Sequence, residues 1–296
     1  MGGPGGTRAI RHCRHPMRPN PVKTRLHAGK TVFGTFLFEF NSPGIMRIAA
    51  VAGAEFVLCD MEHSGWTVET IRRLIASAPL PEDSLPAVNA NTELHRAGCV
   101  PLVRVPATEY HFIARVLDMG AMGVMVPLVE SREQAEKIVQ SARYPPAGRR
   151  GAAFTMPHDG YVSGALNDKI AQANREVLLI AQIETRAGLE HVEEIAAVDG
   201  IDALWIGQTD LTCSLGIPGQ FDHPQFHDAV DRIAIACRQH GKTPAYMPLS
   251  VEEGRRFLQR GFRLMAYSGD LWIYQTALRE GVEALQQHSR DGKAIR

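Results

Sequence analysis

The sequence predicts a single (β/α)8 (TIM) barrel of the α/β class, on three observations. From Thr31 onward, short β-rich apolar runs alternate with amphipathic helical stretches, which is typical of parallel strands joined by helices. Eight such runs occur, and eight is the number of strands in this barrel. With 296 residues and a hydrophobic content of 45%, the chain can form one large core without a second domain. An open, doubly wound sheet is the alternative.

The predicted strands are, in chain order, residues 32–40, 55–61, 100–105, 121–129, 177–184, 201–207, 243–248 and 263–269. A helix is expected after each strand. Ser42 with Pro43, Thr67 with Thr70, and Ser131 are suited to begin three of them, since hydroxyl groups cap free helical amides and proline fits a first turn. The other helices are expected at 111–117, 188–198, 223–241, 250–261 and 271–287. Four glycines stand where helices should end: Gly53, Gly120, Gly241 and Gly261.

The barrel is assigned to residues 21–296. Residues 1–20 are expected to form a disordered extension or to precede a start at Met17, because they are rich in arginine and glycine, contain no acid and lack the apolar face of a transit peptide. Two segments interrupt the alternation. Residues 79–98 are predicted to be an insertion at the N-terminal face of the barrel, and residues 145–168 form a Gly- and Pro-rich segment whose path stays open.

Composition favours a small-molecule partner. The 32 basic residues balance the 32 acidic residues, which gives no overall field to attract nucleic acid or a membrane surface. Polar residues interrupt every apolar run before it reaches the length of a membrane span. The five cysteines form no CxxC pair and their number is odd, so a reducing, cytoplasmic compartment is expected.

Candidate chemistry lies where the predicted strands end, because the C-terminal rim carries the active site in such barrels. Glu184 and Asp210 lie near the ends of two successive runs, and burying an unpaired carboxylate costs several kcal/mol or more. A divalent cation would explain both acids. Other polar residues expected at the same rim are Asp60, Glu62, His63, Arg104 and Gln182. Arginine suits a carboxylate or an oxyanion, and imidazole suits proton transfer.

Simpler interpretations remain for each residue taken alone. Glu184 or Asp210 could cap the following helix, Arg104 could pair with a neighbouring acid, and His63 could be an ordinary, partly buried histidine. Together these residues are harder to explain in that way. The sequence contains no P-loop, GxSxG, HExxH or CxxC motif, which argues against NTPases, serine hydrolases and zinc proteases.

In these residues and the motifs around them, the chain resembles the HpcH/HpaI aldolases. This is a family of metal-dependent (class II) pyruvate aldolases that includes 4-hydroxy-2-oxoheptanedioate and 2-keto-3-deoxy-rhamnonate aldolases. The blocks that carry the resemblance are CDMEHSGW, VPLVRVP, ARYPPAGRRG, LIAQIET and IGQTDLTCSLG, and it extends over nearly the whole barrel. The resemblance implies a barrel of the phosphoenolpyruvate/pyruvate-binding type. It also implies a homo-oligomer, built as a trimer-based hexamer, with the C-terminal helix as a packing element.

The resemblance also implies roles for individual residues. Glu184 and Asp210 match the ligands of a Mg, Mn or Co ion, and Gln182 lies beside them. His63 matches the base, and Arg104 the arginine that binds pyruvate and stabilises its enolate. Asp60 and Asp118 match acids associated with the base, although the sequence places Asp118 at a helix end near the opposite rim. Substrate contacts are expected from Arg104, Gln182, Gly207, Thr209 and Asp210.

The implied reaction is reversible cleavage of a 4-hydroxy-2-oxo acid into pyruvate and an aldehyde through a metal-stabilised enolate. Oxaloacetate decarboxylation or a carbon-carbon condensation is the alternative within related chemistry, and a non-catalytic barrel is the alternative outside it. Many family members have Gly-Pro-x-Asp where this chain has Gly207, Gln208, Thr209 and Asp210. We therefore expect a different, more polar loop beside the metal.

Overall fold

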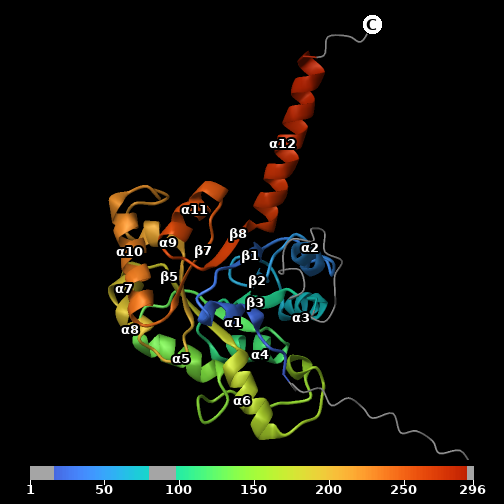
Figure 1. Cartoon of the computed structure of the whole chain (residues 1–296), viewed down its shortest axis with the longest axis vertical. Helices are drawn as coiled ribbons and strands as arrows, with labels where there is room; N and C mark the ends of the chain where they lie inside the picture. The colour runs from blue at the N-terminus through green and yellow to red at the C-terminus, as the bar shows by residue number, and fades with distance from the viewer. Residues whose placement is uncertain (1–16, 80–97, 292–296) are drawn as a thin grey trace, which may run out of the picture.

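The computed structural model describes residues 17–79 and 98–291, and these form a closed barrel of eight parallel strands surrounded by helices (Figure 1). The strands follow one another around the barrel in chain order. They are β1 (Val32–Leu37), β2 (Phe56–Asp60), β3 (Val100–Arg104), β4 (Gly123–Val126), β5 (Leu178–Ile183), β6 (Ala203–Ile206), β7 (Thr243–Tyr246) and β8 (Leu264–Gly269). The barrel closes between β8 and β1, where Val32 pairs with Leu264. The predicted fold is confirmed, and the open sheet is excluded.

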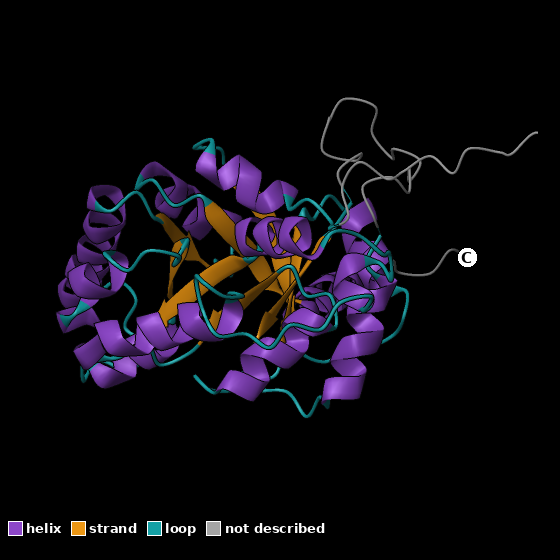
Figure 2. Ribbon diagram, turned by 90° about the horizontal axis from the view of Figure 1, so that it is seen from below, coloured by secondary structure: helices purple, strands orange, loops and turns teal. Residues whose placement is uncertain are grey.

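Successive residues of a strand face opposite sides, and this alternation builds two apolar layers. Residues such as Phe56, Leu58 and Leu178 fill the interior of the barrel. Their neighbours in the sequence, such as Val57 and Cys59, pack outward against the helices. Because both faces are buried, the strands are nearly continuous apolar runs. The orange strands lie inside a ring of purple helices in Figure 2.

The helices are α1 (Pro21–His27), α2 (Ile45–Val51), α3 (Val68–Ser77), α4 (Tyr110–Asp118), α5 (Arg132–Ala142), α6 (Leu166–Glu176), α7 (Arg186–Glu190), α8 (Val192–Ala196), α9 (Gln208–Ser214), α10 (Pro224–Gln239), α11 (Val251–Gln259) and α12 (Asp270–Asp291). The predicted caps Thr67 and Ser131 are confirmed, since their hydroxyls accept the amides of Thr70 and Gln134. All four predicted glycine stops have positive φ.

Three details of the predicted elements were wrong. Gly44, not Ser42, precedes α2, so the turn after β1 is longer than Ser42 with Pro43 suggested. The helix expected at 188–198 is divided at His191 into α7 and α8. The segment 145–168 contains a 3-10 turn at Pro157–Asp159 and leads into α6, a helix that sequence reasoning missed.

The N-terminal end of the described chain packs against the barrel. Asn20 is fully buried; its side chain caps α1 through the amide of Lys23 and donates to the carbonyl oxygens of Met122 and Glu176. Met17 is also buried. Residues 17–20 thus lie against the barrel, and the rest of the segment predicted as an extension falls outside the described residues. Residues 1–16 and most of the predicted insertion, 80–97, lie outside the described residues.

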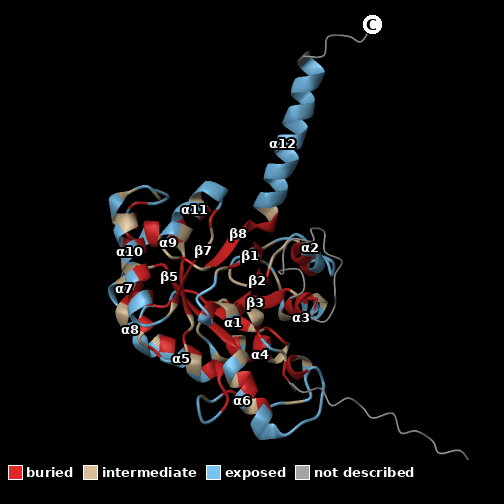
Figure 3. Cartoon of the chain, in the orientation of Figure 1, coloured by how far each residue is buried: buried red, intermediate tan, exposed pale blue. Residues whose placement is uncertain are grey.

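The C-terminal helix α12 projects away from the barrel (Figure 1), and almost all of it is exposed (Figure 3). Every residue from Trp272 to Arg290 is exposed. Asp270 is buried and Leu271 half-buried at the start of the helix, and the rings of Trp272 and Tyr274 contact Phe38 and Phe40 at the rim. Among the helices of the described ranges, none combines the length and apolar character needed to cross a bilayer.

Candidate active site

A cavity of about 280 Å³ lies at the C-terminal ends of the barrel strands. This volume is close to the ~300 Å³ at which small-molecule sites begin. The cavity is lined by Phe36, Phe38, His63, Arg104, Gln182, Trp205, Gly207, Gln208, Thr209, Asp210, Met247 and Trp272. Six of the residues predicted for substrate binding and catalysis are thus brought together: His63, Arg104, Gln182, Gly207, Thr209 and Asp210.

A buried ion pair organises the side of the cavity formed by β2 and β3. Asp60 and Arg104 are aligned by register, since they are paired residues of neighbouring strands. Arg104 Nε lies 2.5 Å from Asp60 Oδ1, and Arg104 Nη1 lies 3.1 Å from Glu62 Oε2. The predicted alternative for Arg104, pairing with a neighbouring acid, is therefore realised. Arg104 still lines the cavity, so the ion pairs orient its guanidinium rather than remove it from the site.

His63 lies at the mouth of the cavity on the turn that follows β2. Asp60 fixes this turn, because its carboxylate accepts the backbone amides of Glu62 and His63 at 3.2 and 2.8 Å. The imidazole itself is largely exposed, and its Nε2 lies 3.7 Å from Glu62 Oε2. In this structure Asp60 therefore positions the backbone of His63 and the side chain of Arg104, and Glu62 is the acid nearest to the ring.

Glu184 lies just beyond β5 and is almost completely buried. Its Oε1 accepts the amide of Leu128 at 2.7 Å, and its Oε2 accepts the side-chain amide of Gln182. Gly207 makes room for it, because a Cβ at this position would collide with Glu184 Oε2. Leu128 holds an unusual backbone conformation, with φ of 53°, which a residue with a side chain adopts rarely. The backbone at Leu128 and at Gly207 thus accommodates the carboxylate of Glu184.

Asp210 and Thr209 are exposed at the start of α9. The segment after β6 was expected to be a loop, but a helix begins at Gln208, directly after Gly207. Gln208 points back to the rim, where its amide donates to the carbonyl of Met247 at 3.0 Å. The alternative for Asp210, an acid that stabilises the first turn of a helix, therefore applies as well. It does not exclude a role in the cavity that Asp210 lines.

Three acids near the cavity repel one another. Burial raises the pKa of Glu184 to about 7, and Glu62 and Asp210 add to the increase. Burial likewise raises the pKa of Glu62 to about 7; Arg104 opposes this shift, while Asp60 and Asp210 reinforce it. The negative charges of Glu184, Glu62 and Asp210 are thus not fully balanced by the positive charge nearby. A cation between the acids would favour their ionised forms.

The donors present fit a divalent metal ion with few protein ligands. Carboxylate oxygens are the preferred ligands of Mg and Mn, and Mg commonly retains water and substrate beside one or two carboxylates. Gln182 Oε1 is buried and has no hydrogen-bond partner among the described residues. Within those residues no three His, Cys, Asp or Glu side chains are close enough to form a metal cage. Glu184 and Asp210 would hold the ion.

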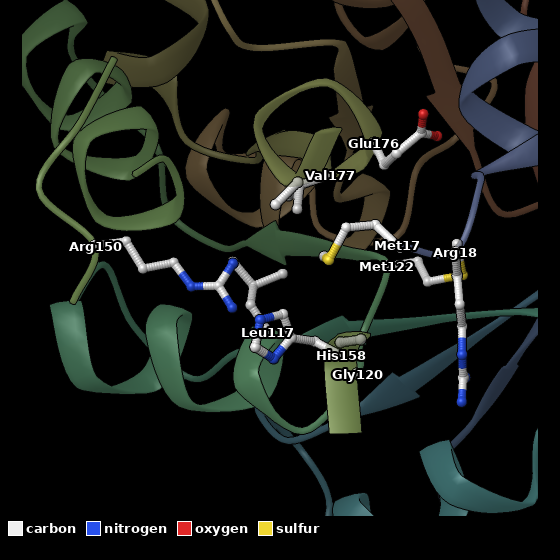
Figure 4. A pocket seen from close by; sticks show the side chains of 11 residues that line it. Met17, Arg18, Leu117, Gly120, Met122, Arg150, His158, Glu176 and Val177 are labelled. Carbon is white, nitrogen blue, oxygen red and sulfur yellow. The ribbon is translucent and has the colours of Figure 1, made fainter. Parts of the chain in front are cut away.

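Asp118 is not brought to this cavity within one chain. It ends α4, and its carboxylate lies 2.6 Å from the buried guanidinium of Arg150. Arg150 also lines a second cavity of only about 30 Å³, together with Leu117, Gly120 and His158 (Figure 4). That space is suited to a water molecule rather than a substrate. The role of Asp118 in catalysis stays a prediction.

Sequence reasoning missed the apolar wall of the cavity. Phe36 and Phe38, which are two residues apart at the end of β1, both line it, as do Met247 after β7 and Trp272 after β8. The alternation of Phe36 and Phe38 was a readable signal, since residues i and i+2 share one face of a strand. Trp272 gave no signal, because it lies in the first turn of a helix assigned wholly to the exterior.

The chain belongs to the HpcH/HpaI aldolase/citrate lyase family, whose model matches residues 33–275. It is 31% identical over 269 residues to a 5-keto-4-deoxy-D-glucarate aldolase of Klebsiella pneumoniae, covering 91% of this chain and 98% of that protein. The solved HpcH/HpaI aldolase of Desulfitobacterium hafniense superimposes with a TM-score of 0.80 at 30% identity, over 91% and 97% of the two chains. A solved citrate synthase, SbnG, gives 0.76 at 30% identity, over 91% and 98%.

Proposed function

We propose that this protein is a metal-dependent aldolase that reversibly cleaves a 4-hydroxy-2-oxo acid into pyruvate and an aldehyde. Family membership and relatives named as aldolases support lyase chemistry. The observation that carries the proposal is that Arg104 and Asp210 line one cavity, while the buried Glu184 lies directly against two other lining residues, Gln182 and Gly207. Such a site suits an anionic 2-oxo acid and the enolate derived from it.

The side chains have separable roles in this proposal. Arg104, oriented by Asp60 and Glu62, binds the substrate carboxylate or the C2 oxygen, where negative charge develops. His63, at the exposed mouth, removes the proton of the C4 hydroxyl during cleavage and returns it during condensation. Gln182 and the backbone at Gly207 and Thr209 contact the oxygen atoms of the 2-oxo acid.

The metal ion, held by Glu184 and Asp210, would supply Lewis-acid stabilisation of the enolate oxygen. The fixed surroundings of Glu184, which include the amide of Leu128 and the space left by Gly207, hold its carboxylate in one orientation. Such supporting contacts commonly change metal affinity by about 10- to 100-fold. Mg or Mn is proposed first and Co second.

The test uses the methyl protons of pyruvate. We expect their exchange with solvent deuterium to require Mg or Mn and to be lost in Glu184→Ala, with NMR as the readout. Glu133→Ala, on the exposed start of α5, serves as a matched control. Exchange that continues in a chelator would contradict the metal role, and the absence of exchange with every metal would favour a non-catalytic barrel.

A carbon-carbon condensation is the second candidate, and the similarity to the citrate synthase SbnG favours it. The same enolate would then attack a second keto acid instead of an aldehyde. Incubation with pyruvate or oxaloacetate and a panel of keto acids, followed by mass spectrometry of the products, distinguishes the two reactions. Oxaloacetate decarboxylation alone does not, because any site that stabilises a pyruvate enolate can support it.

We also propose that the protein is a homo-oligomer, in the form of a trimer-based hexamer. The projecting helix α12 supports association, since apolar side chains recur along one face at Tyr274, Leu278, Val282 and Leu285 and are all exposed. A second copy of the chain is the proposed partner.

The proposed location is cytoplasmic. The described cysteines are free thiols, in keeping with a reducing compartment.

A further inference from the structure

The lining of the cavity is divided into a polar part and an apolar part. The polar side chains come from the ends of β2, β3, β5 and β6, whereas the ends of β7, β8 and β1, which are neighbours in the closed barrel, supply Met247, Trp272, Phe36 and Phe38. The second group and Trp205, which lies inside the barrel below them, are called the aromatic wall. Lysine, arginine and carboxylate side chains are absent from that part of the lining.

The rings of the aromatic wall contact one another in a row. Trp205 meets Phe36 edge to face, with centroids 5.6 Å apart and planes at 77°. Phe36 stacks on Phe38 at 5.1 Å and 10°, and Phe38 contacts Trp272 at 5.1 Å and 59°. These separations lie in the ~4.5–7 Å range that aromatic pairs favour. The row is therefore a packed surface rather than a group of independent side chains.

The backbone is arranged to keep the outer rings together. Gly269, the last residue of β8, lies under both, since a Cβ there would come within 2.7 Å of the Phe38 ring and 3.0 Å of the Trp272 ring. The next residue, Asp270, is buried, and its carboxylate accepts the amides of Phe38, Glu39 and Phe40 at 2.7 to 3.0 Å. The end of β1 and the start of α12 are thus tied to one carboxylate.

The row also has a direction relative to the charged groups. The Arg104 guanidinium carbon lies 5.3 Å from the centroid of Phe36 and 5.8 Å from that of Phe38. Arg104 thus lies over the two middle rings of the row, and Trp272, which contacts Phe38 on the side away from Phe36, is 38% exposed and also lines the cavity. A substrate whose carboxylate end is bound at Arg104 would therefore extend its far end along Phe38 toward Trp272.

We infer that the aromatic wall selects an aldehyde with an apolar, planar substituent, an aromatic aldehyde, in preference to a polyhydroxylated one. The inference rests on the proposed aldolase function. Hydroxyl groups placed against Phe38 and Trp272 would lose water without gaining hydrogen-bond partners, and each such loss is unfavourable. A flat ring gains contact area and favourable stacking at the same place.

The bond changes are those of an aldol addition. A methyl proton of pyruvate is removed, and the resulting enolate carbon attacks the aldehyde carbon, so that one carbon-carbon bond forms. The π electrons of the aldehyde C=O move to its oxygen, which takes up a proton and becomes the C4 hydroxyl. Cleavage is the reverse, and neither direction needs an oxidant or a reductant.

The experiment compares two acceptors with pyruvate and Mg or Mn. We expect kcat/KM for benzaldehyde to exceed that for D-glyceraldehyde by about tenfold or more, since a matched apolar pocket discriminates by this order. In Trp272→Ala the ratio should fall by about tenfold, and in Trp272→Phe it should be largely retained. Ile273→Ala is the matched control, because this exposed residue is next to Trp272 on the same helix but does not line the cavity and lies off the apolar face proposed for assembly.

A preference for D-glyceraldehyde, or a ratio unchanged in Trp272→Ala, would overturn the inference. Deuterium exchange of the pyruvate methyl group separates this outcome from a failure of the proposed function, because the exchange needs no aldehyde. If the exchange proceeds and the acceptor ratio does not respond to Trp272, only the assignment of the aromatic wall is wrong. If Trp272→Ala fails to fold, Phe38→Leu, which keeps an apolar side chain but removes the ring, is measured in its place.

Discussion

Arg104 and Asp60 form a buried ion pair across two neighbouring strands, and this pair joins the fold to the proposed chemistry. The side chains are 9% and 0% exposed, respectively. The same carboxylate holds the turn that carries His63. One acid therefore sets the position of both the Arg104 guanidinium and the turn that carries His63, although it does not itself line the cavity.

Asp60→Asn is expected to lower both stability and activity. The asparagine oxygen can still accept one backbone amide, but Arg104 loses its closest charge partner in a buried setting, and breaking such a pair costs about 3 kcal/mol. Urea denaturation measures the loss. Glu136→Gln, which breaks the exposed pair with Arg132, should cost no more than about 0.5 kcal/mol. Equal effects in the two variants would show that Asp60 has no special part in the structure.

Gly207→Ala is expected to weaken metal binding without unfolding the protein. The added Cβ would displace Glu184 Oε2 and separate it from Gln182. We expect Mn affinity, measured by calorimetry, to fall by about 10- to 100-fold. The control is Gly65→Ala, because a Cβ at Gly65 meets no atom within 4 Å. Unchanged affinity in Gly207→Ala would argue against Glu184 as a ligand.

The stability of the metal-free protein should depend on pH through Glu184. Its pKa is about 7 in the folded protein, against an ordinary value of 4.5, so the folded state holds the proton more tightly. This contribution is fully present below pH 4.5 and is lost as the pH rises through about 7. Glu184→Gln should therefore show a smaller fall in Tm over that interval than the unsubstituted protein.

Magnesium should reverse the pH effect. At pH 8 both Glu184 and Glu62 are ionised, so Mg should raise Tm there more than at pH 5, where proton and metal compete. Differential scanning calorimetry at the two pH values provides the test. An equal increase at both values would mean that the metal binds elsewhere.

Asp118→Asn separates a structural role from a catalytic one. In the structure Asp118 contacts Arg150, which also stacks on Tyr144 with its guanidinium carbon 4.5 Å from the ring centroid. We expect a loss of roughly 1 to 3 kcal/mol in the free energy of unfolding and an unchanged kcat well below Tm. If kcat falls while stability is kept, the role implied by the family resemblance is correct and the single chain is not the complete catalytic unit.

Charged substitutions on α12 should change the state of assembly. Leu278→Glu with Val282→Glu puts two charges on the apolar face of the helix, which disfavours its burial by another copy. Light scattering should then report a smaller particle than that of the unsubstituted protein. Thr276→Glu serves as the control, because this exposed position lies on the other side of the helix. A monomer before substitution would refute the proposed oligomer.

All eight strands could be predicted because a strand buried on both faces is a continuous apolar run. The predicted runs were longer than the strands: the first was placed at 32–40, and β1 ends at Leu37. The extra residues belong to the rim, where Phe38 is apolar because it lines a cavity and not because it continues the strand. Composition alone does not separate these two causes.

The polar part of the site could be predicted because strand ends meet at one rim. The helix that begins at Gln208 could not, because the stretch offers no side-chain cap and glycine precedes it. Trp272 was missed for a different reason. Its position in the cavity depends on Asp270, which binds the backbone amide of Phe38, and on Gly269, which leaves room for the rings of Phe38 and Trp272. Those contacts join segments that are 232 residues apart in the chain and leave no local pattern.

The carboxylate of Asp270 connects the rim of the cavity to the C-terminal helix. On one side it anchors the backbone that carries Phe38, and on the other it begins the helix that extends away from the barrel. A molecule that packs on the start of that helix would therefore bind next to residues that line the cavity. Substitutions of Asp270 should therefore change the preference for the aldehyde acceptor and the oligomeric state together. A variant selected for a new aldehyde would then also differ in its oligomeric state.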